Sequence, residues 1–201
     1  MKRRQLIIGI AVLIFAIGLL VFLTFPRKKP NIITHIGDQP VAQIFQFDQD
    51  ECPGPKVSFK NLDLYLPGLV EKDETVPVVM NWYKCHQPKV GDVVLYRFSW
   101  HREPVLKEIV AIGGDHVDMA LDPDHRGWNL LLNDKIYETN GRKYFVGVPQ
   151  APPPLKLYAD ANSQILKPGL VVVLSTRPPG ETDSGYFGPV SIQDIVGQVQ
   201  K

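Results

Sequence analysis

Lys107 is the residue whose type and surroundings point most directly to chemistry. It lies in the stretch VLKEIVAIGGD, residues 105–115. If this stretch is a strand, Lys107 shares a face with Val105, Ile109 and Ala111. An ammonium among apolar side chains is costly unless it finds a partner or loses its proton, and desolvation moves the pKa of a lysine toward the range of a general base. The alternative is an edge strand whose lysine reaches into water and prevents unwanted pairing.

The elements that must position this lysine are short candidate strands. They are VAQIFQF, KVSFKNLDLYL, VPVVMNWY, GDVVLYRF, PVLKEIVAI, HVDMAL, WNLLLN, KYFVGV, PGLVVVLS and DIVGQV. Several are bounded by Gly, Pro, Asn or Asp at the spacing of a barrel or sandwich, which predicts a mainly β fold. A helical period of 3.6 is hard to find in this part of the chain, and the proline-rich stretch Val148–Pro154 is predicted to be a loop.

The N-terminal stretch predicts a membrane anchor. No charged residue occurs between Gln5 and Phe25, and a helix of about 20 apolar residues spans about 30 Å of hydrocarbon. We therefore expect residues 1–29 to form a transmembrane helix with basic flanks, 30–40 a linker and 41–201 one β domain. Because both flanks are basic, charge alone leaves the orientation open.

Composition excludes several function classes. The 201 residues are 44% hydrophobic and 21% charged, and the net charge of +1 favours neither a nucleic acid nor an acidic partner. No glycine-rich phosphate loop is present, and the histidines show no metal-ligand spacing, so we expect no cofactor and no metal. The two cysteines, Cys52 and Cys85, form a disulfide if their side of the membrane is oxidising and are otherwise two separate thiols.

Three segments in one order resemble the type I signal peptidases. They are QPKVGDVVLYRF (87–98), VLKEIVAIGGDHVD (105–118) and ETDSGYFGPVSIQDIVGQV (181–199). The sequence YFGPV in the last segment most resembles the conjugative-transfer subgroup, which processes pilin precursors.

The resemblance implies an antiparallel β fold with one N-terminal transmembrane helix and a Ser/Lys peptidase with Lys107 as general base. It places Asp115, Asp183 and Ser184 on residues that support the site. It also implies a single-pass protein of the inner membrane, with its catalytic domain on the periplasmic side. The partners would then be the lipid bilayer and precursor proteins carrying a signal peptide or pilin sequence.

The segment that should carry the nucleophile can be aligned with the family in two registers. The counterpart of the family's serine element is TVPVVMNWY, residues 75–83, in which Thr75 lies two residues before Pro77 and takes the place of the serine. Alignment on Tyr83 instead puts Pro77 there, without a hydroxyl. Thr75 is thus the candidate nucleophile, and a β-branched residue beginning a strand is the structural alternative.

Other departures surround the expected site. Glu181 stands where the family has the serine that hydrogen-bonds the lysine, and Leu174–Arg177 replaces a Gly-Asp-Asn element. Gly185 replaces an arginine, which leaves Asp183 without its usual ion-pair partner unless Arg177 substitutes in space. Two functions therefore remain open: a membrane-anchored peptidase for signal or pilin precursors, and a catalytically degenerate fold that binds such segments or assembles with partners.

Overall fold

The computed structural model describes most of the chain after residue 50. The described residues are 35–36, 39–40, 51–62, 66–97, 104–124, 127–147, 151–177 and 183–200. They belong to the second of the two units into which the chain divides, Ile33–Lys201. The predicted anchor and the candidate strand VAQIFQF lie outside these residues. Within them, no helix is long and apolar enough to cross a membrane.

The larger sheet has seven strands, and neighbouring strands pair antiparallel. In order across the sheet they are β14 (Val190–Ser191), β13 (Leu170–Leu174), β6 (Val105–Ile112), β5 (Val93–Tyr96), β15 (Ile195–Val199), β4 (Thr75–Met80) and β3 (Lys56–Lys60). This arrangement confirms the mainly β, antiparallel fold expected from the sequence. It also makes β6 an interior strand, paired on both sides.

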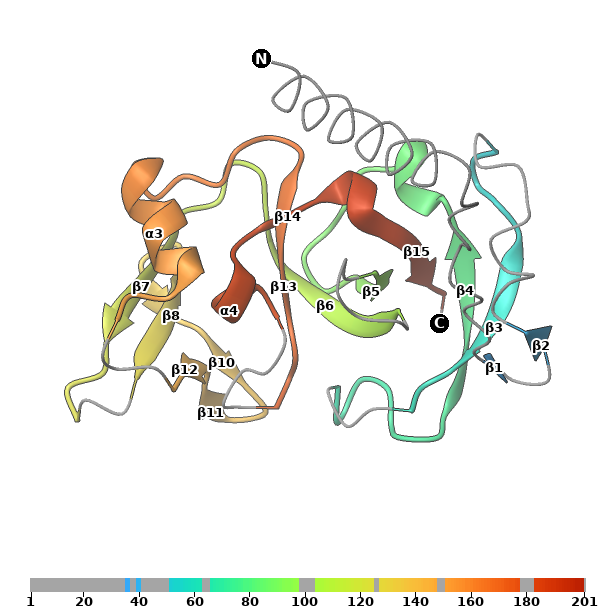
Figure 1. Cartoon of the computed structure of the whole chain (residues 1–201), viewed down its shortest axis with the longest axis horizontal. Helices are drawn as coiled ribbons and strands as arrows, with labels where there is room; N and C mark the ends of the chain where they lie inside the picture. The colour runs from blue at the N-terminus through green and yellow to red at the C-terminus, as the bar shows by residue number, and fades with distance from the viewer. Residues whose placement is uncertain are drawn as a thin grey trace, which may run out of the picture. The chain divides into compact units, whose positions relative to one another are not determined.

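The smaller sheet follows β6 along the chain. It contains β12 (Phe145–Val146), β8 (Trp128–Leu132) and β7 (Val117–Leu121), with β9 (Lys135–Ile136) on β8. Two further pairs of short strands are β1 (His35–Ile36) with β2 (Gln39–Pro40), and β10 (Glu138–Thr139) with β11 (Arg142–Lys143). In Figure 1, β6 and β13 run side by side between the β7–β8 hairpin and the strands β15, β4 and β3.

Short helices complete the described fold. They are η1 (Trp82–Lys84), α3 (Pro154–Ala161), α4 (Ser184–Phe187) and η2 (Ile192–Asp194). Helix α3 was not expected from the sequence, because a loop was predicted up to Pro154. A proline fits the first helical position, and Leu155 and Ala159 are buried one turn apart. Eight residues with two buried positions are too few to display a helical period.

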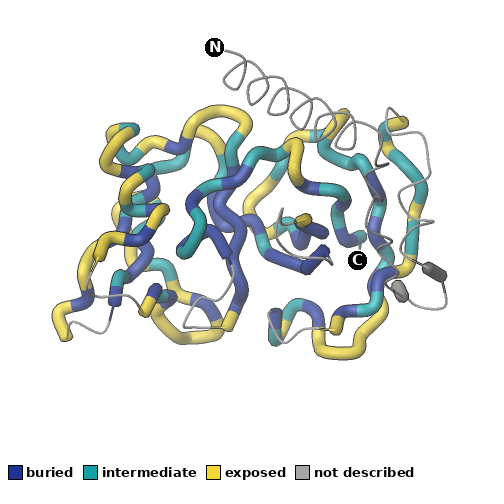
Figure 2. Tube along the Cα trace, viewed as in Figure 1, coloured by how far each residue is buried: buried dark blue, intermediate teal, exposed yellow. Residues whose placement is uncertain are grey.

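The β6 strand is surrounded by core on both faces. Val105 and Ile109 belong to one cluster of buried residues, as the predicted alternation requires. Ala111 was expected on the same face but lies in a second cluster with Leu174. The reason is a register shift between β6 and β13 at Val172/Val173, which changes the facing of the residues beyond it. Figure 2 shows this central part of the sheet as largely buried.

Candidate active site

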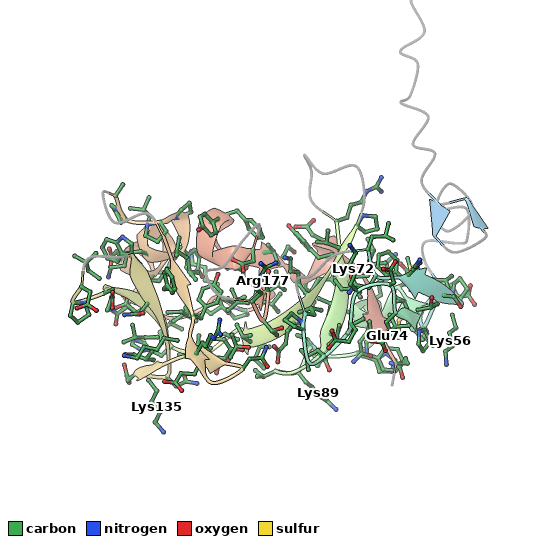
Figure 3. All side chains as sticks on the ribbon, turned by 90° about the horizontal axis from the view of Figure 1, so that it is seen from below. Lys56, Lys72, Glu74, Lys89, Lys135 and Arg177 are labelled. Atoms are coloured by element: carbon green, nitrogen blue, oxygen red, sulfur yellow. A yellow bond between two sulfur atoms is a disulfide. The ribbon has the colours of Figure 1, made fainter. Side chains whose placement is uncertain are left out.

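Lys107 is fully buried, with an exposed fraction of 0%. The surface lysines Lys89 and Lys135 extend away from the ribbon in Figure 3, as lysines in solvent do. Because β6 is an interior strand and Lys107 is enclosed, the edge-strand interpretation of this lysine is wrong. The opposite residue in β5 is Val94, which is also fully buried, so the neighbour of Lys107 on that strand is apolar.

The Lys107 amine reaches the hydroxyl of Ser175. Nζ donates a hydrogen bond to Ser175 Oγ at 2.8 Å, and Ser175 is 1% exposed. Strand β13 ends at Leu174, which lies opposite Glu108 of β6. The next pair along this antiparallel ladder brings Ser175 opposite Lys107. The contact thus follows from the pairing of two strands that are far apart in the sequence.

Asp183 is a buried carboxylate behind Ser175. Its Oδ2 accepts the backbone N–H of Ser175 at 3.1 Å, and its Oδ1 accepts the Tyr144 hydroxyl at 2.5 Å. Oδ1 also accepts the backbone N–H of Gly185, so Asp183 caps the N-terminus of α4. The carboxylate therefore fixes the backbone of Ser175, the residue that faces Lys107.

The electrostatics of this carboxylate reflect two opposing effects. Burial raises the pKa of Asp183 above its usual range, whereas the hydrogen bond from Tyr144 and the charge of Lys107 favour its ionised form. Burial and the neighbouring Asp183 together raise the pKa of Tyr144 well above that of a free phenol. Tyr144 therefore remains a hydroxyl donor throughout the neutral range.

The hydroxyl of Tyr144 lies where a side chain at position 185 would extend, and Gly185 leaves that space free. A Cβ added at Gly185 would lie 2.6 Å from Tyr144 Oη and 2.6 Å from Val146 Cγ2, so any larger residue would collide. The sequence left Asp183 without its expected arginine, and the structure gives it a phenol donor. Arg177, the substitute considered from the sequence, is exposed and is labelled in Figure 3.

The other supporting residues are spread along the sheet. Ser184 is buried, and its Oγ accepts the backbone N–H of Val173, which ties α4 to β13. Asp115 accepts the backbone N–H of Ile112 and so stabilises the turn after β6. That turn lies beyond the end of β6, five residues past Lys107, or about 17 Å along a strand. Glu181 lies outside the described residues.

Thr75 is exposed and begins β4, where it pairs with Lys60. The row of residues that runs across the sheet from Lys107 passes through β5 and β15 and reaches β4 at Val79. Thr75 is therefore three strand spacings of about 4.8 Å away across the sheet, and four residues of about 3.3 Å along β4. The hydrogen-bond register does not make Thr75 a neighbour of Lys107.

Tyr83 is the residue of the expected nucleophile segment that packs on the Lys107 side. It contacts the cluster that contains Ile109, and its hydroxyl donates to Asp92 Oδ2 at 2.8 Å. Burial and that carboxylate raise the pKa of Tyr83 above its usual range. Tyr83 therefore anchors the segment to the start of β5 and keeps its phenol protonated.

Cys52 and Cys85 form a disulfide, with their Cα atoms 5.9 Å apart. The sequence had left this pairing open. His86 Nδ1 lies close by, so these three residues place their ligand atoms within 4.8 Å of one another. Sequence spacing gave no sign of this group, because Cys52 comes from a segment 33 residues earlier.

The comparisons with known proteins identify the family of the chain. A scan against protein families matched residues 52–201 to the family described as signal peptidase, peptidase S26. The chain belongs to this family. Members of the S26 family are serine endopeptidases that act on precursor proteins with signal peptides. A search of the curated proteins found no match.

Among solved structures, a signal peptidase I from Enterococcus faecalis V583 is similar to this S26 chain. The two share 16% sequence identity at a TM-score of 0.37, and the alignment covers 57% of this chain and 98% of that chain.

Ser175 is the residue of this candidate site that the sequence did not identify. It appeared only as a departure from the family's Gly-Asp-Asn element. One signal was present, because the predicted strand PGLVVVLS is apolar except for its terminal serine. The pairing of β13 with β6 was needed to turn that signal into a contact. Together, Lys107 and Ser175 supply an amine and a hydroxyl within proton-transfer distance, in surroundings from which water is largely excluded.

Proposed function

We propose that this protein is a signal-peptidase-like endopeptidase that uses Lys107 as general base and Ser175 as the hydroxyl nucleophile. The observation that carries the proposal is the 2.8 Å hydrogen bond between Lys107 Nζ and Ser175 Oγ. Nucleophile and base within such reach are the signature of hydroxyl-based covalent catalysis.

The chemistry requires a neutral lysine. Burial makes the Lys107 ammonium costly and so favours the free amine, whereas the Asp183 carboxylate favours the charged form. A lysine base requires that the cost of burial outweighs the attraction of Asp183. A neutral amine keeps a lone pair, so the Ser175 hydroxyl can donate to Nζ in the reverse sense of the bond described above. When Oγ attacks the scissile carbonyl, its proton passes to Nζ, and the lysine then returns that proton to the leaving amine.

Asp183 acts as a positioning residue in this proposal. It holds the Ser175 backbone and is itself held by Tyr144 and by the start of α4. A hydroxyl that must remain within reach of one amine needs such support, because small displacements reduce proton transfer strongly.

Thr75 is the competing nucleophile that the sequence suggests. Its exposure would allow a peptide to reach it, whereas Ser175 is buried and must become accessible when the precursor binds. Its register argues against it, because Lys107 does not lie beside it in the sheet. The two candidates differ in one respect that experiment can test, namely which hydroxyl the reaction requires.

The wider setting of the proposal comes from the sequence. The apolar stretch within residues 1–29 favours a single-pass anchor in the inner membrane, with the β domain on the periplasmic side. The resemblance of the YFGPV motif to the conjugative-transfer subgroup favours pilin precursors among the substrates. An extended peptide would bind along a strand of the domain, as peptides commonly do when they add to a sheet.

A second candidate function is a fold that binds precursors without cutting them. The burial of Lys107 and Ser175 favours it, because a peptide carbonyl has no open route to either group as the described residues stand. The experiment must therefore establish cleavage before it assigns residues.

The test is cleavage of co-expressed secretory and pilin precursors by the full-length protein, with the new N-terminus of each product read by mass spectrometry. The informative variant is Lys107→Met, which removes the amine but keeps the length and apolar stem of the side chain. Lys135→Met is the matched control, because Lys135 is exposed on β9. We expect cleavage by the wild type and the control, and none by Lys107→Met. Cleavage by Lys107→Met at the wild-type rate would refute a lysine base, and a silent wild type would favour the binding function.

A further inference from the structure

The group formed by Cys52, Cys85 and His86 lies outside the proposed active site. Cys85 is exposed, and Cys52 and His86 are half-buried, so solvent reaches the group. Thiolate sulfur and imidazole nitrogen are the ligands that Zn²⁺ prefers, and three protein ligands with one open position are a common arrangement. We propose that, when the disulfide is reduced, these three side chains bind a Zn²⁺ ion.

The two segments that carry the cysteines are held together by contacts other than the disulfide. Gly54 N–H donates to Met80 O at 2.8 Å, and Met80 N–H donates to Pro55 O at 3.1 Å. A Cβ added at Gly54 would lie 2.9 Å from Met80 O, so the absence of a side chain permits this close approach. Asn81 Nδ2 also donates to Glu51 O at 3.1 Å. These contacts keep the two cysteines adjacent after reduction, and their sulfurs then separate to the distance of about 3.8 Å that two thiolate ligands of one zinc ion require.

The His86 imidazole lies next to the sulfurs. The His86 ring stacks on Trp82, with centroids 3.6 Å apart and an interplanar angle of 3°. This fixes Nδ1 at 3.2 Å from Cys85 Sγ. In tetrahedral zinc sites, a sulfur and a nitrogen ligand lie about 3.5 Å apart, as follows from their bond lengths to the metal. The observed spacing is close to that value.

In the disulfide form, His86 Nδ1 is engaged in a hydrogen bond. His86 Nδ1 lies 3.0 Å from the carbonyl oxygen of Trp82, so in the disulfide form it carries the proton and donates to that carbonyl. Metal binding would move the proton to Nε2 and turn the Nδ1 lone pair to the ion. The disulfide and the metal are thus alternative states of one site.

The change of state balances as a two-electron reduction followed by ligand exchange. A dithiol or a phosphine supplies two electrons, and the disulfide takes up two protons to give two thiols. Zn²⁺ then binds as both thiols lose their protons. Because affinity depends on deprotonated thiols, binding weakens as the pH falls.

The experiment is a titration of the full-length protein in detergent with Zn²⁺ in competition with a chromophoric chelator. One sample is first reduced with a phosphine, which is then removed without air, and one sample stays oxidised. We expect the reduced protein to bind one equivalent, and the oxidised protein to bind more than about tenfold more weakly. Cys52→Ser, Cys85→Ser and His86→Ala should each weaken binding by more than about tenfold, and His116→Gln, a histidine outside the group, should not.

Cobalt provides a second readout that does not depend on affinity. Co²⁺ bound by both thiolates gives a sulfur-to-metal charge-transfer band in the near ultraviolet, and this band should be reduced in either cysteine variant. Equal Zn²⁺ affinity in the oxidised and reduced proteins, or an unchanged band in both cysteine variants, would overturn the site. None of these results depends on peptidase activity.

Discussion

Lys107 Nζ and Ser175 Oγ lie 2.8 Å apart although 68 positions separate the two residues in the chain. The ladder between β6 and β13 sets this contact. Both residues are buried, so the hydrogen bond contributes to the stability of the fold as well as to the proposed chemistry.

Removal of the Ser175 hydroxyl should destabilise the domain. In Ser175→Ala, Nζ loses an acceptor in a buried position, and we expect a loss of about 1–2 kcal/mol in the free energy of unfolding. In the Lys107→Met background the same change should cost less, because the amine that needed the acceptor is gone. Urea unfolding of the four proteins in this cycle measures the coupling. Strictly additive losses would show that the two side chains do not interact.

Tyr144→Phe should destabilise the protein more at pH 7 than at pH 4. Loss of the phenol donor raises the folded-state pKa of Asp183 further above its ordinary value of 3.8, because that donor favours the carboxylate. A carboxyl group with a raised folded pKa loses stability as the pH rises through the window above 3.8. We expect a deficit of about 1–2 kcal/mol at pH 7 that shrinks toward pH 4. Urea unfolding at both pH values measures it, and a deficit independent of pH would mean that Asp183 does not depend on this donor.

Gly185→Ala should be destabilising because of its neighbours. The new methyl group would meet Tyr144 Oη and Val146 Cγ2, each at 2.6 Å, and overpacking of this kind typically costs about 1–3 kcal/mol. Thermal unfolding with and without Tyr144→Phe tests the explanation. The cost should fall when the phenol oxygen is removed, and it should persist in part because Val146 remains. An unchanged cost would assign the whole effect to Val146.

Loss of the disulfide should lower stability but leave the fold in place. The bond closes a loop with a sequence separation of 33, for which chain entropy predicts a contribution of about 3–4 kcal/mol. The β3–β4 ladder and the contacts of Gly54 keep the two segments together without it. The double variant Cys52→Ala, Cys85→Ala should therefore keep the wild-type far-ultraviolet circular dichroism and unfold at lower urea concentration. A reduced wild type serves as the control.

Local pattern predicted the strand that carries the proposed base. The alternation in VLKEIVAI predicted β6 and the apolar neighbours Val105 and Ile109, but it left open whether Lys107 is enclosed or lies on an edge strand. Ala111 was placed wrongly, because a register shift between two strands is a property of their pairing and leaves no mark on either sequence alone. Helix α3 was missed for a different reason, since its eight residues are too few to show a period.

The partners of the buried charges were beyond the sequence. Ser175 and Tyr144 are ordinary polar residues in strand-like segments, and only the folded sheet brings them to Lys107 and Asp183. The family resemblance located the lysine and the aspartate through their motifs. It could not identify Ser175 and Tyr144 as their partners, because neither residue matches a residue of the family's motifs.

The most direct test of the account is the initial rate of precursor cleavage by Ser175→Ala and by Thr75→Ala, each measured beside the wild type under the same conditions. If Ser175 is the nucleophile that Lys107 serves, Ser175→Ala should lose cleavage by about 1,000-fold or more, and Thr75→Ala should keep the wild-type rate. Loss of cleavage in Thr75→Ala with full activity in Ser175→Ala would contradict the account and return the nucleophile to the start of β4.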